Sequence, residues 1–201
     1  MTEASTKTRI LQEAARIFTE KGYEGASMQD LAQALGLSKA ALYHHFRSKE
    51  EILYQISLLA LSELVARGER ALEEEDPRKA LLLFMEGHAR YLEENHPFFV
   101  AMLQGLASLS PPHRVASPSG EHRAETVRLR DRYEASLRRI LQRGVEQGVF
   151  RPVDLALAGR AVLSLLNWMI RWFKPGGPMR AEEVAREYWD LMLRGLQDGN
   201  L

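Results

Sequence analysis

The amino-acid sequence predicts an all-α fold, with a short helical head followed by a larger helical body. Apolar residues recur at helical spacing along almost all of the 201 residues, and no segment shows the alternation typical of a strand. Glycines, prolines and capping residues divide these stretches into nine helices. The chain is 45% hydrophobic and 27% charged, which is enough apolar material to bury a core.

Composition excludes several classes of protein. The chain has no cysteine, which excludes disulfides, thiolate catalysis and cysteine-bound metal. No uncharged apolar run approaches the roughly 20 residues of a membrane span, and the first residues are polar, so we expect a cytoplasmic protein without a membrane partner. The net charge is zero; residues 1–49 hold seven basic and five acidic side chains, too small an excess to indicate nucleic-acid binding by itself.

Three short helices are predicted for the head. The first runs over residues 7–21 and ends at Gly22. The second begins at Ser27, where Ser27 and Asp30 form a capping pattern, and stops at Gly36. The third begins at the N-cap Ser38 and closes at residues 47–48.

The second and third helices and the tight turn between them have the pattern of a helix-turn-helix. Such a pair braces a recognition helix in the major groove of DNA. Leu42 and Phe46 are four residues apart and are expected to point inward. The outer face of the third helix then consists of small, polar and cationic side chains, namely Ser38, Lys39, Ala40, Ala41, Tyr43 and His44. A capping pattern at residues 48–51 begins a long fourth helix, where Lys49 and the first amides could hold a phosphate.

The body is predicted to contain five more helices. Asp76 and Pro77 begin the fifth, and Asp154 caps the eighth. A loop with three prolines, residues 110–120, is predicted to lie at the surface and could cover the mouth of a pocket. The expected ranges are 77–95, 98–108, 122–147, 155–173 and 181–196.

The first 53 residues resemble the TetR/AcrR family of transcriptional regulators. The resemblance lies in four segments in order, FTEKGY at 18–23, SMQDLA at 27–32, LSKAALYHHF at 37–46 and SKEEIL at 48–53. It implies a homodimer that binds palindromic double-stranded operator DNA and responds to a small-molecule effector, with a DNA-binding domain at 1–48 and a ligand-binding and dimerisation domain at 49–201. It also implies backbone contacts from Tyr43, His45 and Lys49 and base contacts from Lys39 and Ala41, and we add Ser27 to this DNA-binding set.

A second, shorter resemblance concerns the effector. Residues 167–177, NWMIRWFKPGG, and the following EEVA at 182–185 are similar to TetR regulators that respond to CoA thioesters, which implies a repressor of fatty-acid or aromatic-acid breakdown and no bound cofactor. An acyl-CoA needs an apolar tunnel and cationic groups for its phosphates. The candidate residues are Phe84, Tyr91, Phe99, Met102, Leu103, Leu106, Trp168, Arg128, Arg132 and Arg171.

Other interpretations stay open at this point. The apolar candidates also suit ordinary helix packing, and the arginines also suit solvated or paired surface charges. The eighth helix and residues 188–192 also suit a dimer interface. A multidrug sensor that controls an efflux pump would have the same fold, and Glu93 with His96 matches half of a di-iron enzyme motif.

Overall fold

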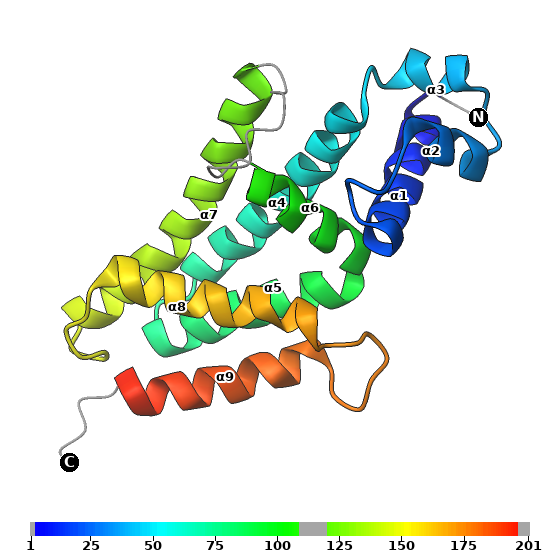
Figure 1. The fold of residues 1–201 in the computed structure, drawn as a ribbon. Helices are drawn as coiled ribbons and strands as arrows, with labels where there is room; N and C mark the ends of the chain where they lie inside the picture. Colours follow the sequence, from blue (N-terminus) through cyan, green and yellow to red (C-terminus); the bar gives the residue numbers. More distant parts are fainter. Residues whose placement is uncertain (1–2, 109–119, 197–201) are drawn as a thin grey trace. The chain divides into compact units, whose positions relative to one another are not determined.

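The structure, a computed structural model, describes residues 3–108 and 120–196 (Figure 1). Within these ranges the secondary structure consists of helices, with no strand, as the sequence predicts. None of the described helices is both long and apolar enough to cross a membrane. The elements are α1 (Glu3–Lys21), α2 (Met28–Leu35), α3 (Lys39–His45), α4 (Lys49–Leu72), α5 (Pro77–Glu94), α6 (His96–Ser108), α7 (Gly120–Glu146), α8 (Leu155–Trp168), the 3₁₀ turn η1 (Met169–Arg171) and α9 (Ala181–Leu196).

The chain forms two compact units, and each contains segments that are distant in sequence. The first unit combines residues 1–61 with residues 97–128, and the second combines residues 62–96 with residues 129–201. Both α4 and α7 therefore contribute one part to each unit. The predicted domain boundary after residue 48 stays a prediction.

The core of the first unit includes α6 as well as the head. Apolar side chains from α1 to α4 pack together, and Ala101 of α6 is fully buried among them. Phe98 packs against the same cluster, and the Gln104 side chain donates a hydrogen bond to the Phe18 carbonyl at 3.3 Å. At Gly105, an added Cβ would lie 2.5 Å from the Ser57 hydroxyl oxygen, so only glycine lets α6 approach α4 this closely.

Local capping signals place most helix ends where the sequence predicts them. The Ser27 hydroxyl accepts the Asp30 amide at 3.1 Å, and the Asp30 carboxylate accepts the Ser27 amide at 2.9 Å. Asp76 and Asp154 likewise cap α5 and α8. These signals depend on neighbouring residues alone, which is why the sequence predicts them well.

Several predicted helix ends differ from the structure, among them the end of α3, which is His45 and not residues 47–48. Helix α1 begins at Glu3 instead of residue 7, and α6 begins at His96, so that Pro97 lies inside the first turn, where a proline is tolerated. The predicted helix 155–173 ends at Trp168, after which the backbone tightens into η1. The predicted loop at 110–120 falls outside the described residues, except that Gly120 begins α7.

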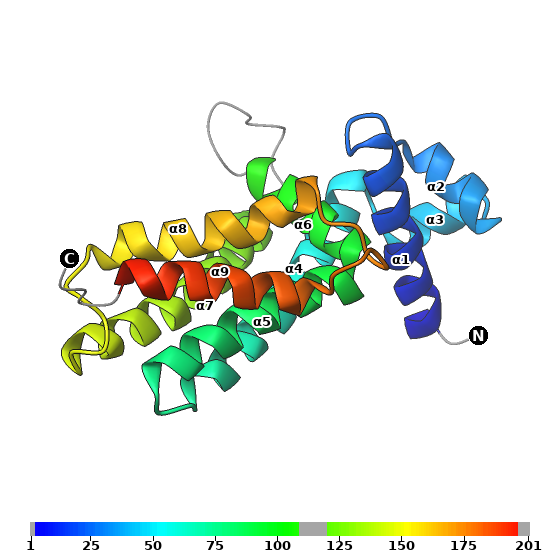
Figure 2. The same cartoon turned by 90° about the horizontal axis from the view of Figure 1, so that it is seen from below.

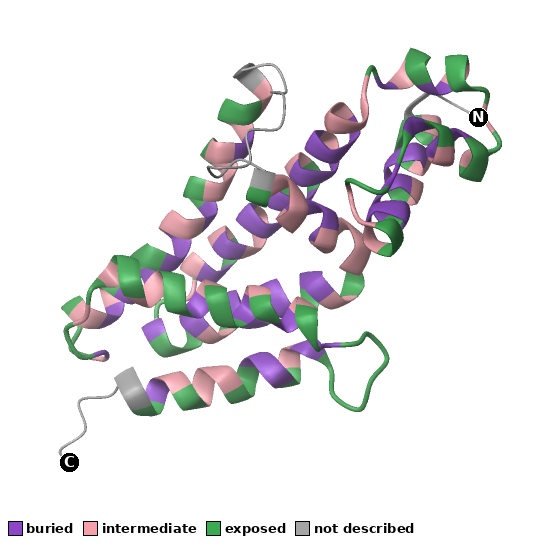
Figure 3. Ribbon diagram, viewed as in Figure 1, coloured by how far each residue is buried: buried purple, intermediate pink, exposed green. Residues whose placement is uncertain are grey.

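In the second unit, α9 lies along α5 and polar contacts fix it there (Figure 2). The Arg186 guanidinium lies 2.5 Å from the Glu86 carboxylate, and Arg90 lies 2.7 Å from Glu182. The indole of Trp189 donates to the Arg78 carbonyl at 2.9 Å. Buried and exposed bands alternate along these helices, as amphipathic packing requires (Figure 3).

A buried polar pair lies within the core of this unit. His88 is 1% exposed, and its Nδ1 atom lies 2.9 Å from the hydroxyl of Tyr133, which is also buried. The Tyr133 ring stacks on Phe84 with 4.8 Å between ring centroids. Burial lowers the pKa of His88 to about 3, so this side chain is neutral in the folded protein.

The buried His88 should make the protein less stable in acid. A histidine in the unfolded chain titrates near pH 6.5, so below that pH the unfolded state binds a proton that the folded state does not. The free energy of unfolding should be insensitive to this group above about pH 6.5 and fall by up to about 1.4 kcal/mol per pH unit between there and about pH 3. Urea unfolding at several pH values measures this slope.

The matched test replaces one histidine at a time. His88→Gln should remove most of this slope, whatever it does to stability at neutral pH, whereas replacement of the exposed His44 should leave it unchanged. An equal slope in the unaltered protein and the His88 variant would contradict the assignment.

Candidate nucleic-acid interface and effector-binding residues

The turn between α2 and α3 has the geometry that a helix-turn-helix needs. Gly36 ends α2 with φ of 64°, a left-handed conformation that favours glycine. The Leu37 amide then donates to the Ala32 carbonyl at 2.9 Å, which closes the turn. Leu31 and Leu42 are fully buried on the inner faces of the two helices. The inner faces are thus used for packing, and the outer face of α3 is left for a partner.

The outer face of α3 carries most of the side chains that the sequence predicts to contact DNA. Ser38 caps the helix by accepting the Ala41 amide at 3.1 Å. Lys39, Ala40 and His44 are exposed, as is Tyr43, whose ring lies 5.9 Å from the Lys39 ammonium. The structure therefore brings together on one helix small residues for close approach, a cation and hydroxyl groups, as a groove-reading surface requires.

His45 and Ser27, also assigned to the DNA-binding set, have different surroundings. His45 is half-buried, and its Nδ1 atom is enclosed without a hydrogen-bond partner among the described residues. Ser27 is exposed and belongs to the capping box of α2. Contacts to DNA from these two residues stay predictions.

Lys49 has a structural role that the sequence does not reveal. Its ammonium donates to the Tyr23 carbonyl at 2.7 Å and to the Ala26 carbonyl at 2.9 Å, and it lies 4.2 Å from the Tyr23 ring centroid. These contacts join the start of α4 to the loop between α1 and α2. Lys49 was predicted only to contact a phosphate, and the structure shows that it also holds this loop in place.

The first amides of α4 are largely engaged by the protein itself. The Glu51 amide donates to the Ser48 hydroxyl at 3.2 Å, and the Arg47 amide donates to the Glu51 carboxylate at 2.7 Å. Glu50 also hydrogen-bonds its own amide, one of the contacts that lower the pKa of its carboxyl. A phosphate at this helix end would therefore compete with two carboxylates.

Replacing Lys49 with alanine should weaken binding to every DNA sequence by about tenfold or more. Two backbone carbonyls would lose a charged donor, and hydrogen bonds to charged groups contribute about 1.5–3 kcal/mol each. If Lys49 also touches a phosphate, the slope of log affinity against log salt should flatten by about one. Fluorescence anisotropy over a salt series measures both quantities.

The control for Lys49 is the exposed Lys39, whose ammonium lies over the Tyr43 ring, 5.9 Å from the ring centroid. Lys39→Ala should lower DNA affinity and leave the melting temperature unchanged, whereas Lys49→Ala should lower both. Wild-type affinity and stability in the Lys49 variant would contradict its assigned role.

The apolar effector candidates are mostly core residues. Phe84, Tyr91, Phe99 and Met102 are at most 4% exposed, and Leu103 and Leu106 are half-buried. Phe84 and Tyr91 belong to the second unit, while the four α6 residues belong to the first. Their assignment to a ligand tunnel stays a prediction.

The cationic effector candidates differ in how they are partnered. Arg128 pairs with Glu125 on its own helix, and Arg132 pairs with Glu69 at 2.7 Å. Arg171 instead lies over the ring of Trp168, with 5.5 Å from its guanidinium carbon to the ring centroid. Trp168 is 65% exposed and Arg171 is exposed as well, and among the described residues Arg171 has no carboxylate partner, unlike Arg128 and Arg132.

Glu93, which with His96 matches half of a di-iron motif, has a structural role. The Glu93 carboxylate accepts the Ala181 amide at 3.0 Å, which ties α5 to the start of α9. Among the described residues, no three metal-binding side chains gather into a site.

Comparison with known proteins decides the family. Residues 10–56 match the model described as bacterial regulatory proteins of the tetR family, and residues 74–196 match the tetracyclin repressor-like C-terminal domain. The chain belongs to the TetR family. Members of this family are transcriptional regulators, so the protein described here is a transcriptional regulator with a tetracyclin repressor-like C-terminal domain, and not an enzyme.

Several TetR-family relatives match over nearly the whole chain. The transcriptional repressor KstR2 of Mycolicibacterium smegmatis is 30% identical over 198 residues, which cover 96% of this chain and 91% of KstR2. The structure of PfmR from Thermus thermophilus is 72% identical with a TM-score of 0.83, covering 94% of this chain and 99% of PfmR. A structure of AibR in complex with isovaleryl coenzyme A and operator DNA is 28% identical with a TM-score of 0.76, covering 92% and 96%.

Proposed function

We propose that the protein binds a palindromic operator as a homodimer and is released from it by a CoA thioester. The acid from which this thioester is made would then induce its own breakdown. The observation that carries the choice of effector is the similarity to AibR over both the head and the body, because the AibR structure contains isovaleryl coenzyme A and operator DNA. Release as the direction of the response is what the family resemblance implies. The similarity to KstR2 supports repression as the direction of control. Binding to operator DNA would place the protein in the cytoplasm.

A dimer follows from the physics of operator recognition. One recognition helix buries little surface, whereas two helices held one DNA turn apart, about 34 Å, read both halves of a palindrome. An effector that favours a different spacing releases the DNA, and a coupling free energy of about 1–3 kcal/mol suffices for a switch of about 5–150-fold.

Exposed apolar side chains support α8 and α9 as the dimer interface. Leu157 and Trp168 on α8 are each 65% exposed, Leu165 is 38% exposed, and Leu191 on α9 is 66% exposed. Large apolar side chains gathered on one surface are typical of sites that bind a partner. We name this set, Leu157, Leu165, Trp168 and Leu191, the apolar stripe.

Displacement of operator DNA by a panel of ligands tests the effector. The protein first selects a duplex from a random pool, and CoA thioesters, free acids and cationic dyes are then titrated into the complex. Release by CoA thioesters alone supports the proposal. Release only by free acids or dyes would remove the CoA hypothesis and favour a multidrug sensor, and selection of no duplex would contradict DNA binding itself.

Arg171→Ala should leave operator affinity unchanged and raise the CoA-thioester concentration needed for release by about tenfold. Removal of a guanidinium that binds a phosphate weakens the effector but not the DNA. Lys174→Ala, which removes another exposed cation three residues away, is the matched control. Size-exclusion chromatography checks the fold of both variants, and an unfolded or monomeric Arg171 variant would show that the residue is structural.

A further inference from the structure

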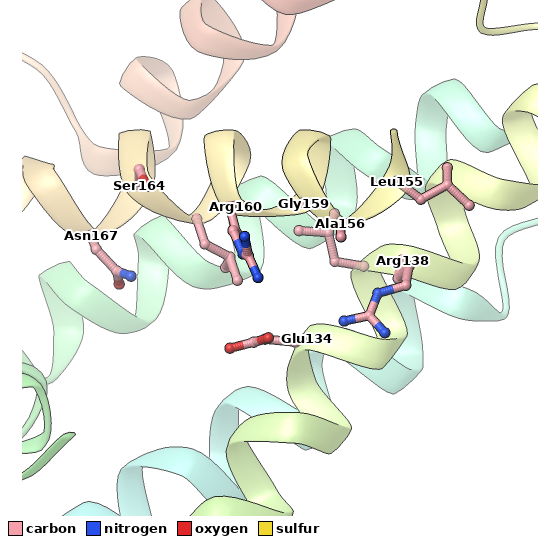
Figure 4. Close-up of a pocket in the computed structure, with 10 residues that line it drawn as sticks. Glu134, Arg138, Leu155, Ala156, Gly159, Arg160, Ser164 and Asn167 are labelled. Atoms are coloured by element: carbon pink, nitrogen blue, oxygen red, sulfur yellow. The ribbon is translucent and has the colours of Figure 1, made fainter. Parts of the chain in front are cut away.

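A hollow between α7 and α8 in the second unit has two arginines at its rim (Figure 4). Arg138 reaches into it from α7 and Arg160 from α8. Its volume is about 200 Å³. Leu137 and Leu163 form apolar walls, and the Gly159 position is bare, since an added Cβ there would meet only a Leu137 methyl at 3.9 Å.

These two arginines differ in their partners from Arg130 and Arg132 of α7. On the same helix, Arg130 lies 2.8 Å from Asp131, and Arg132 lies 2.7 Å from Glu69. Arg138 and Arg160 have no ion pair with any residue that the structure describes. Two guanidinium groups from separate helices therefore face one hollow without a carboxylate partner, which is the arrangement that binds a phosphate.

The other polar groups of the hollow indicate more than an inorganic anion. Ser164 and Asn167 follow Arg160 by four and seven residues and so lie on the same side of α8. Glu134, whose carboxylate also lies 3.7 Å from Arg130, points into the hollow from α7. A carboxylate would repel a bare phosphate, but it would accept the exocyclic amino group of an adenine. The set suits a ligand with phosphate at one end and N–H donors at the other.

We propose that this hollow binds the 3′-phosphorylated adenosine end of a CoA thioester, an inference that rests on the proposed function. Drug-sized ligands occupy pockets of about 300–1,000 Å³, so a hollow of about 200 Å³ takes one end of such a ligand and not the whole molecule. The acyl chain then lies elsewhere, and the hollow supplies affinity for the nucleotide common to all CoA thioesters.

We expect the two arginines of the hollow to stay accessible in the proposed dimer. With 3.6 residues per turn, α8 presents three separate faces. Val162 and Leu166 face the core, Leu157 and Trp168 belong to the apolar stripe, and Arg160 and Asn167 lie on a third side toward α7. A second copy that covers the apolar stripe therefore leaves the arginines accessible.

Calorimetric titration of the full-length protein with adenosine 3′,5′-bisphosphate tests the site directly. The unaltered chain should bind this probe, and a variant with Arg138→Gln and Arg160→Gln should bind it at least about tenfold more weakly. Arg139→Gln is the matched control, because it removes the adjacent exposed arginine that does not line the hollow. Unchanged melting temperatures confirm that all the proteins are folded.

Three outcomes would overturn the site: no binding of the bisphosphate by the unaltered protein, equal binding by the double variant, or equally tight binding of inorganic pyrophosphate. The last would show a general anion site without preference for the nucleoside. Operator release separates this inference from the proposed function. If CoA thioesters release both the unaltered protein and the double variant at the same concentration, the hollow is not the site although the function stands. If they release neither, the proposed effector is wrong.

Discussion

A protein carrying Leu157→Glu and Leu191→Glu should be a monomer at concentrations at which the unaltered chain is a dimer. Both leucines belong to the apolar stripe and are about two-thirds exposed in the single chain. Burial of each at an interface contributes about 1.5–3 kcal/mol, and a buried carboxylate without a partner costs several more. In a dimer with a twofold axis, both subunits carry each substitution, so its effect on the interface occurs twice.

The loss of the dimer should lower operator affinity by at least about a hundredfold, because each 1.4 kcal/mol changes affinity tenfold. Analytical ultracentrifugation measures the mass, and fluorescence anisotropy measures DNA binding. Leu83→Glu is the control, since Leu83 is a similarly exposed leucine, 45%, on α5 and outside the stripe. A double variant that remains dimeric would show that the subunits meet through another surface.

Gly144→Ala should destabilise the protein by about 1–3 kcal/mol. Phe150 folds back onto the end of α7, where its amide donates to the Gly144 carbonyl at 3.0 Å and its ring is 2% exposed. A Cβ on Gly144 would overlap this ring and lie 2.9 Å even from its Cγ atom. Overpacking costs about 1–3 kcal/mol, and expulsion of the ring loses about 1.5–3 kcal/mol of burial.

Urea unfolding measures this loss against Gly159→Ala, a change of the same kind on α8. The new methyl at residue 159 would meet only Leu137 at 3.9 Å, so the gain in helix propensity, about 0.5–1 kcal/mol, should prevail. Opposite signs for the two substitutions are expected. Equal stability of the Gly144 variant and the unaltered protein would contradict the packing of Phe150.

The parts of the fold that the sequence predicts are those determined locally. The capping box of Ser27 and Asp30 and the glycine turn at Gly36 each depend on a few adjacent residues, and the structure has them where expected. The end of α8 is not predicted because residues 160–173 remain mostly apolar and contain no glycine or proline. The change to a 3₁₀ turn at Met169 accompanies the burial of Met169 and Phe173, which depends on packing with distant residues.

The candidate sites show the same difference between features that are determined locally and features that depend on packing between distant residues. The outer face of α3 was predictable because helical periodicity and Leu42 fix which side is buried. The hollow was not, because it needs Arg138 and Arg160 to meet across two helices whose relative register no local pattern encodes. The pairing of Arg132 with Glu69, 63 residues away, was hidden for the same reason.

The burial of Ala101 and Phe98 against the head has a consequence for protein engineering. Hybrid regulators are made by joining the reading head of one repressor to the sensor of another, with the junction placed in the linear sequence. A junction near residue 49 would here give the transplanted head a foreign α6 and remove the Gln104 contact to Phe18. A working hybrid should carry the donor segment that corresponds to residues 97–128 together with its first 61 residues.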